Sequence, residues 1–385
     1  MRQTTNMRKS AFAAIALLLA VAATPTLAQT REFPSKKAAL SVETLATGLK
    51  QPWSVEVLSD GGYLVSEKGG TLRLVRNHTV STPISGVPEV ATNGQGGLLD
   101  IALAPDFATS RILYFTYSAR GDGGIGTAVG KARLSDDATK LEGATRIFLM
   151  NRLTTRGQHF GSRIAIAKDG SLFFGIGDRG EGERAQDMRD HAGAILHINP
   201  DGSPHADNPF NGSADGLSEI WSKGHRNPQG LAIDPKDDTL LSVEHGARGG
   251  DEINLPLPGR NYGWPLVSYG RHYSGAEFEF GASAEGYEQP LYYWDPSIAP
   301  GAIAVYRGAM FPEWDGNLIV AALKYQLVAR LERDESGAVV SEERLFDGEL
   351  GRIRDVVVAP DGALLLLTDA EDGALLRISR SAVTD

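Results

Sequence analysis

The chain has 385 residues, of which 42% are hydrophobic and 22% charged, with a formal net charge of −10 and no cysteine. A chain of this length can bury a large core without disulfides. Its acidic balance argues against a nucleic-acid partner, and the lack of cysteine excludes thiol nucleophiles, zinc–thiolate sites, iron–sulfur clusters and c-type haem.

Residues 1–28 have the pattern of a secretory signal peptide. Arg2, Arg8 and Lys9 precede an apolar run from Ala11 to Ala23, and small residues follow up to Ala28. This run is shorter than the roughly 20 apolar residues that a membrane-spanning helix needs. We therefore predict cleavage near Ala28, export to a bacterial periplasm and no stable membrane insertion. The predicted signal contains three positive charges and no negative ones, so the full chain has a net charge of −10 and the mature chain would have −13.

One pattern recurs in the rest of the chain: an alternation of apolar residues, a turn rich in Asp, Gly or Pro, and a second apolar run. Copies occupy residues 53–75, 98–118, 162–178, 229–246, 306–331 and 353–379. A small antiparallel sheet cannot bury both of its faces alone, so neighbouring copies must pack face to face and close into a ring. The sequence therefore predicts an all-β fold, a six-bladed β-propeller. A pair of β-sandwiches would need a linker between two cores, and the chain has none.

We expect residues 29–37 to form an N-terminal extension and residues 38–381 a single propeller domain. The spacing between copies is widest at about 180–225 and about 255–305. Insertions of this size are expected as loops on the face that carries the binding site.

Two polar residues lie in Gly-rich turns early in the chain. Gln95 stands in NGQGGLLDIAL, where a simple turn residue is the alternative to a functional one. His159 precedes one strand of a predicted hairpin, and Asp178 ends the next strand. If Asp178 reaches one ring nitrogen of His159, it fixes the tautomer and makes the other nitrogen a candidate base. The alternative is an ordinary structural histidine.

Cationic residues recur at the starts of, or within, strands of different blades. Arg352 and Arg354 lie on one side of an extended segment, because side chains alternate with period two. Several cations that meet near the propeller axis would repel one another unless a polyanion lay between them. We therefore expect a ligand with several carboxylates, as the alternative to ordinary solvated charges. The polar residues of this set are Arg226, Asn227, Lys324, Arg352 and Arg354.

The segment 244–265 is rich in glycine and contains Asp251, Glu252 and Tyr262. Loops of this kind offer carbonyl and carboxylate oxygens, which are the ligands that calcium takes. A long surface loop is the alternative, since the chain has neither an HExxH motif nor an EF-hand loop. Trp294, in LYYWDPSIAP, is a candidate to stack on a sugar ring or on a cofactor edge, or it is a core residue.

Five segments in order resemble the soluble quinoprotein glucose and aldose sugar dehydrogenases, the glucose/sorbosone dehydrogenase family. The resemblance covers nearly the whole mature chain. The segments are NGQGGLLDIAL, HFGSRIAIAKDGSLFFGIGD, GHRNPQGLA, GGDEINL with NYGWP, and RIRDVVVAPDG.

The resemblance implies a six-bladed propeller that holds pyrroloquinoline quinone (PQQ), a tricarboxylate, together with calcium. It implies that His159 is the general base, that Asp178 orients it and that Gln95 contacts the sugar. It further implies that Arg226, Asn227, Lys324, Arg352 and Arg354 hold PQQ. Calcium on the quinone would be bound by the carbonyl groups of Gly246 and Ala247, and a second, structural calcium by Glu252 and Tyr262.

Two departures from the glucose-specific members favour a broader aldose dehydrogenase. Gln158 stands where those members have an aspartate beside the base, and the residues after Asp178 do not reproduce their substrate-binding glutamine. We hypothesise that the protein is a monomer that oxidises the C1 hydroxyl of an aldose to the lactone. His159 would take the proton, Arg226 would stabilise the negative charge that develops on the quinone, and the electrons would pass to a quinone or a cytochrome. The alternatives are a calcium-dependent propeller lactonase and a non-catalytic carbohydrate-binding propeller.

Overall fold

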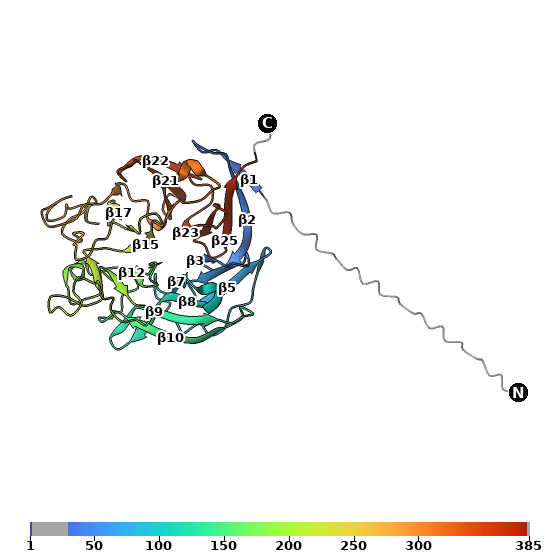
Figure 1. Cartoon of the computed structure of the whole chain (residues 1–385), viewed down its shortest axis with the longest axis horizontal. Helices are drawn as coiled ribbons and strands as arrows, with labels where there is room; N and C mark the ends of the chain where they lie inside the picture. The colour runs from blue at the N-terminus through green and yellow to red at the C-terminus, as the bar shows by residue number, and fades with distance from the viewer. Residues whose placement is uncertain (2–29, 383–385) are drawn as a thin grey trace.

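The computed structural model describes residue 1 and residues 30–382, so the predicted signal peptide lies, apart from Met1, outside the described residues. The described chain forms six antiparallel sheets arranged in a ring (Figure 1). The predicted all-β, six-bladed propeller is therefore confirmed. Helices are limited in the described residues to α1 (Phe107–Ser110), η1 (Gly182–Gln186) and η2 (Pro312–Trp314). No helix in that part of the chain is long and apolar enough to cross a bilayer.

The blades follow one another in chain order, and each begins with its innermost strand. Blade 1 contains β3 (Pro52–Val57), β4 (Tyr63–Glu67), β5 (Thr71–Arg76) and β6 (Thr79–Val80). Blade 2 contains β7 (Leu98–Leu103), β8 (Ile112–Gly121), β9 (Gly124–Leu134) and β10 (Leu141–Leu149). Blade 3 contains β11 (Ile164–Ile166), β12 (Leu172–Ile176), β13 (Ala194–Ile198) and β14 (Ile220–Lys223). Blade 4 contains β15 (Pro228–Ile233), β16 (Leu240–Glu244), β17 (Asp251–Asn254) and β18 (Tyr292–Trp294). Blade 5 contains β19 (Pro300–Val305), β20 (Leu318–Ala322), β21 (Leu327–Arg333) and β22 (Val339–Leu345).

Blade 6 closes the ring by combining the two ends of the chain. Its strands are β23 (Ile353–Val358), β24 (Leu364–Thr368), β25 (Gly373–Arg380), β2 (Leu40–Leu49) and β1 (Thr30–Phe33), in that order across the sheet. Strand β2 pairs with β25 from Leu40 opposite Arg380 to Leu49 opposite Gly373. Residues 30–33, within the predicted N-terminal extension, form β1 and pair with β2.

The core lies between adjacent blades, and strand alternation distributes the apolar side chains to both sides of each blade. In β24, Leu364 and Leu366 pack with residues of blade 5, whereas Leu365 and Leu367 pack with residues of blade 1. All four are fully buried. A run of leucines is therefore expected here, because successive side chains of a strand buried on both faces enter different interfaces.

The boundaries of some repeats differ from the sequence pattern. The fifth blade begins at Pro300 with β19, earlier than the predicted copy that starts at residue 306. The segment 180–225 is not a single loop, because it contains β13 and β14 of blade 3. The long insertion of blade 4 spans 255–291, between β17 and β18. The short and interrupted apolar runs of these strands explain why they resembled loops in the sequence.

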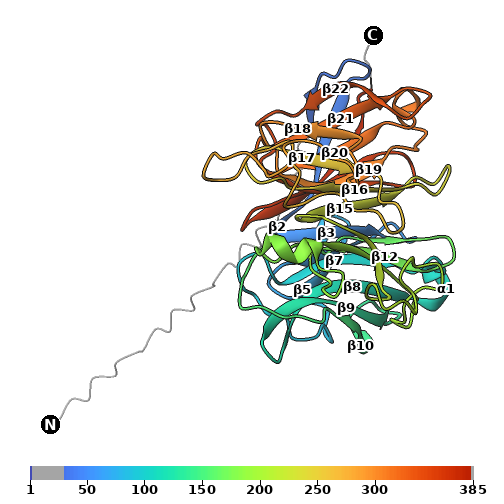
Figure 2. The ribbon, with the colours of Figure 1, turned by 90° about the vertical axis from the view of Figure 1, so that its left-hand side faces the viewer.

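The topology gathers particular loops at one end of the propeller. Because the strands of a blade are antiparallel, the loop before the first strand and the loop after the second lie at the same end. For blade 3 these loops hold His159 and Asp178, and for blade 4 they hold Arg226 and Gly246. In Figure 2, turned by 90°, blades 1 to 3 lie in the lower part of the view and blades 4 and 5 in the upper part. The end of the propeller that carries the loops with His159, Asp178, Arg226 and Gly246 is called the active-site face.

Candidate active site

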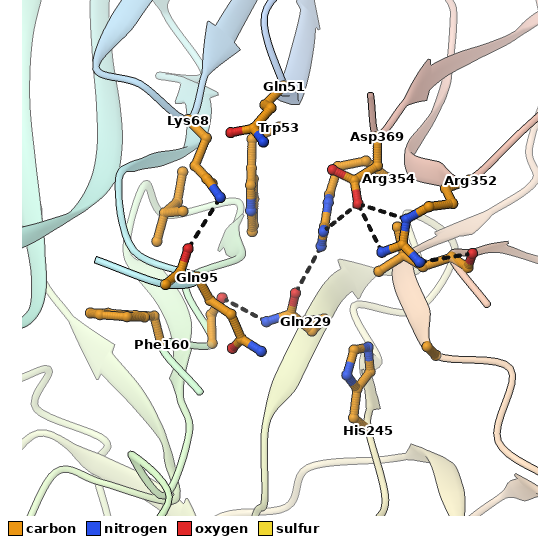
Figure 3. Close-up of a pocket in the computed structure, with 15 residues that line it drawn as sticks. Gln51, Trp53, Lys68, Gln95, Phe160, Gln229, His245, Arg352, Arg354 and Asp369 are labelled. Atoms are coloured by element: carbon orange, nitrogen blue, oxygen red, sulfur yellow. Dashed lines mark hydrogen bonds and ion pairs between the residues drawn. The ribbon is translucent and has the colours of Figure 1, made fainter. Parts of the chain in front are cut away.

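A cavity of about 310 Å³ opens at the active-site face, where the blades converge (Figure 3). Its size is at the lower end of the roughly 300–1,000 Å³ typical of small-molecule sites. Of the residues predicted to act in the site, Gln95, Arg352 and Arg354 line it. The other labelled lining residues are Gln51, Trp53, Lys68, Phe160, Gln229, His245 and Asp369.

Arg352 and Arg354 share one carboxylate. Asp369 Oδ2 accepts hydrogen bonds from Arg352 Nη2 at 2.9 Å and from Arg354 Nη2 at 3.1 Å. Burial alone would raise the pKa of Asp369, but the charges of Arg354 and Arg352 lower it below its usual value. With Lys68 on the opposite wall, the cavity has more positive than negative side chains (Figure 3). The arrangement is complementary to an anion.

Polar side chains connect the arginine pair to blades 3 and 4. Arg354 Nη1 donates to Gln229 Oε1 at 3.1 Å, and Gln229 Nε2 donates to Asn227 Oδ1 and to the Gly161 carbonyl at 3.3 Å each. His245 Nε2 donates to the Pro300 carbonyl at 2.8 Å, and burial lowers the pKa of His245 to about 4. The neutral ring therefore adds a hydrogen-bonding group to the cavity without a charge.

His159 and Asp178 are in contact, which is the condition that the sequence analysis set for His159 as a candidate base. His159 Nδ1 and Asp178 Oδ1 are 2.6 Å apart, and both residues are buried. Burial alone would raise the pKa of Asp178, but the hydrogen bond and charge of His159, the Gly180 amide and Arg226 lower it. A carboxylate at Nδ1 holds the proton there, which leaves Nε2 as the acceptor nitrogen of the neutral ring. The His159 amide also donates to Gln95 Oε1 at 2.7 Å, so Gln95 contacts His159 and also lines the cavity.

Arg226 is held in a buried position beside the cavity. Its backbone amide donates to Glu244 Oε2 at 2.6 Å, and its guanidinium donates to the His245 carbonyl and to Tyr273 Oη at 3.2 Å each. Arg226 Nε, Asn227 Nδ2 and Arg354 Nε are buried without a hydrogen-bond partner in the described structure. Buried donors are usually satisfied, so three unsatisfied donors in neighbouring residues indicate a place for a ligand with acceptor atoms.

The residues predicted to bind calcium lie in and around the loop after β16. A Cβ added to Gly246 would lie 2.1 Å from the Gly249 carbonyl oxygen and 2.3 Å from that of Gly250, so the loop is too tight for a side chain at this position. Ala247 and Lys324 line a second, more open cavity of about 680 Å³. Among the described residues, no group of three or more His, Cys, Asp or Glu side chains is arranged to hold a metal. Backbone oxygens would therefore have to supply part of any metal site.

Glu252 and Tyr262 lie close together around a small cavity that Glu244 also lines. Burial, followed by the charge of Glu244, raises the pKa of Glu252 to about 8. Asn254 Nδ2 donates to both carboxylates, while its Oδ1 is buried without a partner. Adjacent carboxylates are ligands suited to a hard cation.

Trp294 does not line any of these cavities. It is 3% exposed and packs in the core between blades 4 and 5. Its position favours the core alternative that the sequence left open.

Several residues that line the first cavity were not predicted from the sequence. Gln229 stands inside GHRNPQGLA, one of the segments that carried the family resemblance, whereas Trp53, Lys68 and Asp369 lie outside those segments. Asp369 lies fifteen residues beyond its partner Arg354, after the second strand of the same blade. Asp369 lies next to Arg354 because β24 runs antiparallel to β23 and brings the chain back to the same end of the blade.

Comparison with known proteins gives consistent matches over most of the chain. The sequence matches the Glucose / Sorbosone dehydrogenase family over residues 49–377. It is 42% identical over 348 residues to aldose sugar dehydrogenase YliI of Escherichia coli (strain K12), covering 89% of this chain and 93% of that protein. A crystal structure described as glucose dehydrogenase superposes with a TM-score of 0.86 at 44% identity, over 88% of this chain and 99% of the other. The PQQ-bound form of aldose sugar dehydrogenase from Streptomyces coelicolor superposes with a TM-score of 0.73 at 30% identity, over 89% of this chain and 99% of the other.

Proposed function

Because the chain belongs to the glucose/sorbosone dehydrogenase family and is an oxidoreductase acting on CH–OH donors, we propose that it oxidises the C1 hydroxyl of aldoses to the lactone with PQQ and calcium. The observation that carries this proposal is the set of three buried, unsatisfied donors beside a cavity rich in cations. A solved relative is described as PQQ-bound, which supports the same cofactor here.

The residues fit an anionic cofactor. PQQ has three carboxylates, and Arg226, Asn227 and Arg354 each retain a buried nitrogen with no partner. Arg352 adds a guanidinium that Asp369 already holds in place, and Lys324 adds an exposed ammonium group. Hydrogen bonds between guanidinium groups and carboxylates are strong and directional. We therefore propose that these five residues hold PQQ.

The residues also fit calcium at two places. The carbonyl groups of Gly246 and Ala247, in the loop after β16, would bind the ion that contacts the cofactor. Glu252 and Tyr262, with Glu244 and Asn254 beside them, would hold a structural ion. Occupancy of this second place would favour ionised Glu252, whose pKa is otherwise raised to about 8.

When bound, PQQ supplies a carbonyl carbon that accepts a hydride, and calcium increases its electrophilicity. The protein supplies the proton transfer. Asp178 keeps the Nδ1 proton of His159 in place, so His159 Nε2 accepts the proton of the C1 hydroxyl. Gln95, fixed by the His159 amide, is placed to contact the sugar. Arg226 supplies a positive charge beside the site of negative charge development.

The cellular context follows from the same proposal. The N-terminal signal pattern supports export to a periplasm. There, a quinone or a cytochrome would accept the electrons from a monomeric enzyme.

The test is reconstitution of purified apoprotein. Oxidation of a panel of aldoses, followed with an artificial dye, should require PQQ and calcium together. Arg354→Ala should raise the PQQ concentration needed for half-maximal activity by roughly 10- to 100-fold, since hydrogen bonds to charged groups are worth about 1.5–3 kcal/mol.

Arg377→Ala is the matched control, because Arg377 forms an ion pair with Asp361 in the β23–β24 turn, at the end of blade 6 opposite the active-site face, and should leave the titration unchanged. Lactone hydrolysis restored by calcium alone would instead identify a propeller lactonase. No turnover and no uptake of PQQ would identify a binding propeller.

A further inference from the structure

Trp264 is outside the predicted site but contacts two of its residues, Asp178 and Arg226. It belongs to NYGWP in the blade 4 insertion, yet its indole reaches blade 3. Trp264 Nε1 donates to Asp178 Oδ2 at 2.8 Å. The Arg226 guanidinium lies 5.2 Å from the centre of the same indole ring. One side chain therefore contacts both the carboxylate that orients His159 and the arginine beside the cavity.

The two oxygens of Asp178 have different partners. Oδ1 is shared by His159 Nδ1 at 2.6 Å and by the Gly180 amide at 2.7 Å. Among the described residues, Trp264 Nε1 is the hydrogen-bond donor to Oδ2. Arg226 is the other charged group that acts on this carboxylate from blade 4. The neighbouring Arg179 donates instead to the carbonyls of Gln158 and Arg156. The indole therefore hydrogen-bonds to Oδ2, the carboxylate oxygen that His159 does not contact.

The indole is itself held firmly. The Trp264 amide donates to the Gly224 carbonyl at 3.0 Å, and its own carbonyl accepts from Gln186 Nε2 at 2.6 Å. Phe278 packs against the ring at 5.3 Å between ring centres. The residue is therefore fixed by blade 3 and by its own insertion, as a donor that sets the orientation of another group must be.

We propose that Trp264 is a positioning residue that fixes the plane and the charge of the Asp178 carboxylate and, through it, the basicity of His159; this inference rests on the proposed role of His159. With a donor on each oxygen the carboxylate cannot rotate away from the imidazole. Removal of the donor from Oδ2 concentrates negative charge on the carboxylate and favours the protonated imidazole. The base would then be protonated over a wider range of pH.

The test measures the titration of His159 by NMR in the apoprotein, where no cofactor is needed. Trp264→Phe removes the donor and retains an aromatic ring. Replacement of Trp264 by benzothienylalanine removes only the N–H and keeps the shape of the indole. In both variants the pH midpoint of the His159 ring signals should rise by roughly 0.5–1 unit, as expected for loss of one hydrogen bond. Trp221→Phe is the control, since Trp221 Nε1 donates to the Pro256 carbonyl, at 3.0 Å, and not to Asp178.

In the reconstituted enzyme, the acid limb of the kcat profile should move to higher pH by the same amount, with the KM for the aldose unchanged. An unchanged His159 midpoint in the benzothienylalanine variant would overturn the proposal, and that variant answers the question even if Trp264→Phe does not fold. Failure of the proposed function is recognised separately. If His159→Ala retains full activity, His159 is not the base, whatever its titration shows.

Discussion

At the scale of single residues, the active-site backbone adopts conformations that few side chains accept. His159, Ser162 and Arg179 have φ values of 54°, 97° and 57°. Non-glycine residues in this region store strain, which persists where surrounding contacts compensate for it. Here the compensation includes the His159–Asp178 hydrogen bond and the bond from the His159 amide to Gln95. His159 is therefore positioned before any ligand arrives.

His159→Ala should lower kcat by roughly 10²- to 10⁴-fold, the usual contribution of a positioned base. Its affinity for PQQ should stay near that of the wild type, since the proposed PQQ-binding residues are untouched. Stopped-flow reduction of the reconstituted enzyme measures the first quantity and a PQQ titration the second. His78→Ala, at an exposed turn, serves as the control. Full activity in His159→Ala would contradict the assigned role.

At the scale of elements, each blade depends on its neighbours for its core. Leu366 in β24 is fully buried, stands opposite Val356 of β23 and Leu376 of β25, and packs toward blade 5. Blade 6 also joins the two ends of the chain through β2 and β25. A defect in this blade therefore affects both the local packing and the closure of the ring.

Leu366→Ala should reduce the free energy of unfolding by about 2–5 kcal/mol, because a cavity forms where blades 5 and 6 meet. Urea denaturation of the apoprotein, followed by fluorescence, measures the loss. Val340→Ala, at a residue that is 58% exposed, should change it by less than about 0.5 kcal/mol. Equal effects of the two substitutions would show that this interface contributes little.

At the scale of the whole molecule, the six inner strands surround an axis with different chemistry at its two ends. A cavity of about 260 Å³ lies among the strand residues distant from the active-site face and is lined by Glu56, Asp100, Arg163 and Asp355. Arg163 Nη1 pairs with Asp100 at 2.8 Å and with Asp355 at 3.0 Å, which links blades 2, 3 and 6. Burial, followed by the charges of Asp100 and Asp355, raises the pKa of Glu56 from 4.5 to about 8.

Glu56 should make the stability of the fold depend on pH. Between about pH 4.5 and 8 the folded protein keeps a proton on Glu56 that the unfolded chain releases, so stability falls as pH rises through this range. Glu56→Gln should remove this part of the slope and be more stable than the wild type above about pH 8. Urea midpoints measured from pH 5 to 9 check the prediction, with Glu335→Gln in an exposed turn as the control. Parallel curves for wild type and Glu56→Gln would contradict it.

Sequence patterns alone predicted the six blades and located the segments that resemble a known family. These features are readable because alternation, turns and motifs are local, and because antiparallel blades bring equivalent loops to one end. The contacts between distant side chains became apparent in the folded structure. Asp369 pairs with Arg354 across the return of β24, Gln229 meets Arg354 from 125 residues away, and Trp264 crosses from blade 4 to Asp178.

Trp294 is the converse case, a candidate site residue that the structure places in the core. An aromatic residue near a predicted site reads equally well as a ligand contact or as core, and only the packing of blade 4 against blade 5 places it in the core. Closure of the ring fixes such contacts, because it sets distances between segments that the sequence pattern leaves independent of one another.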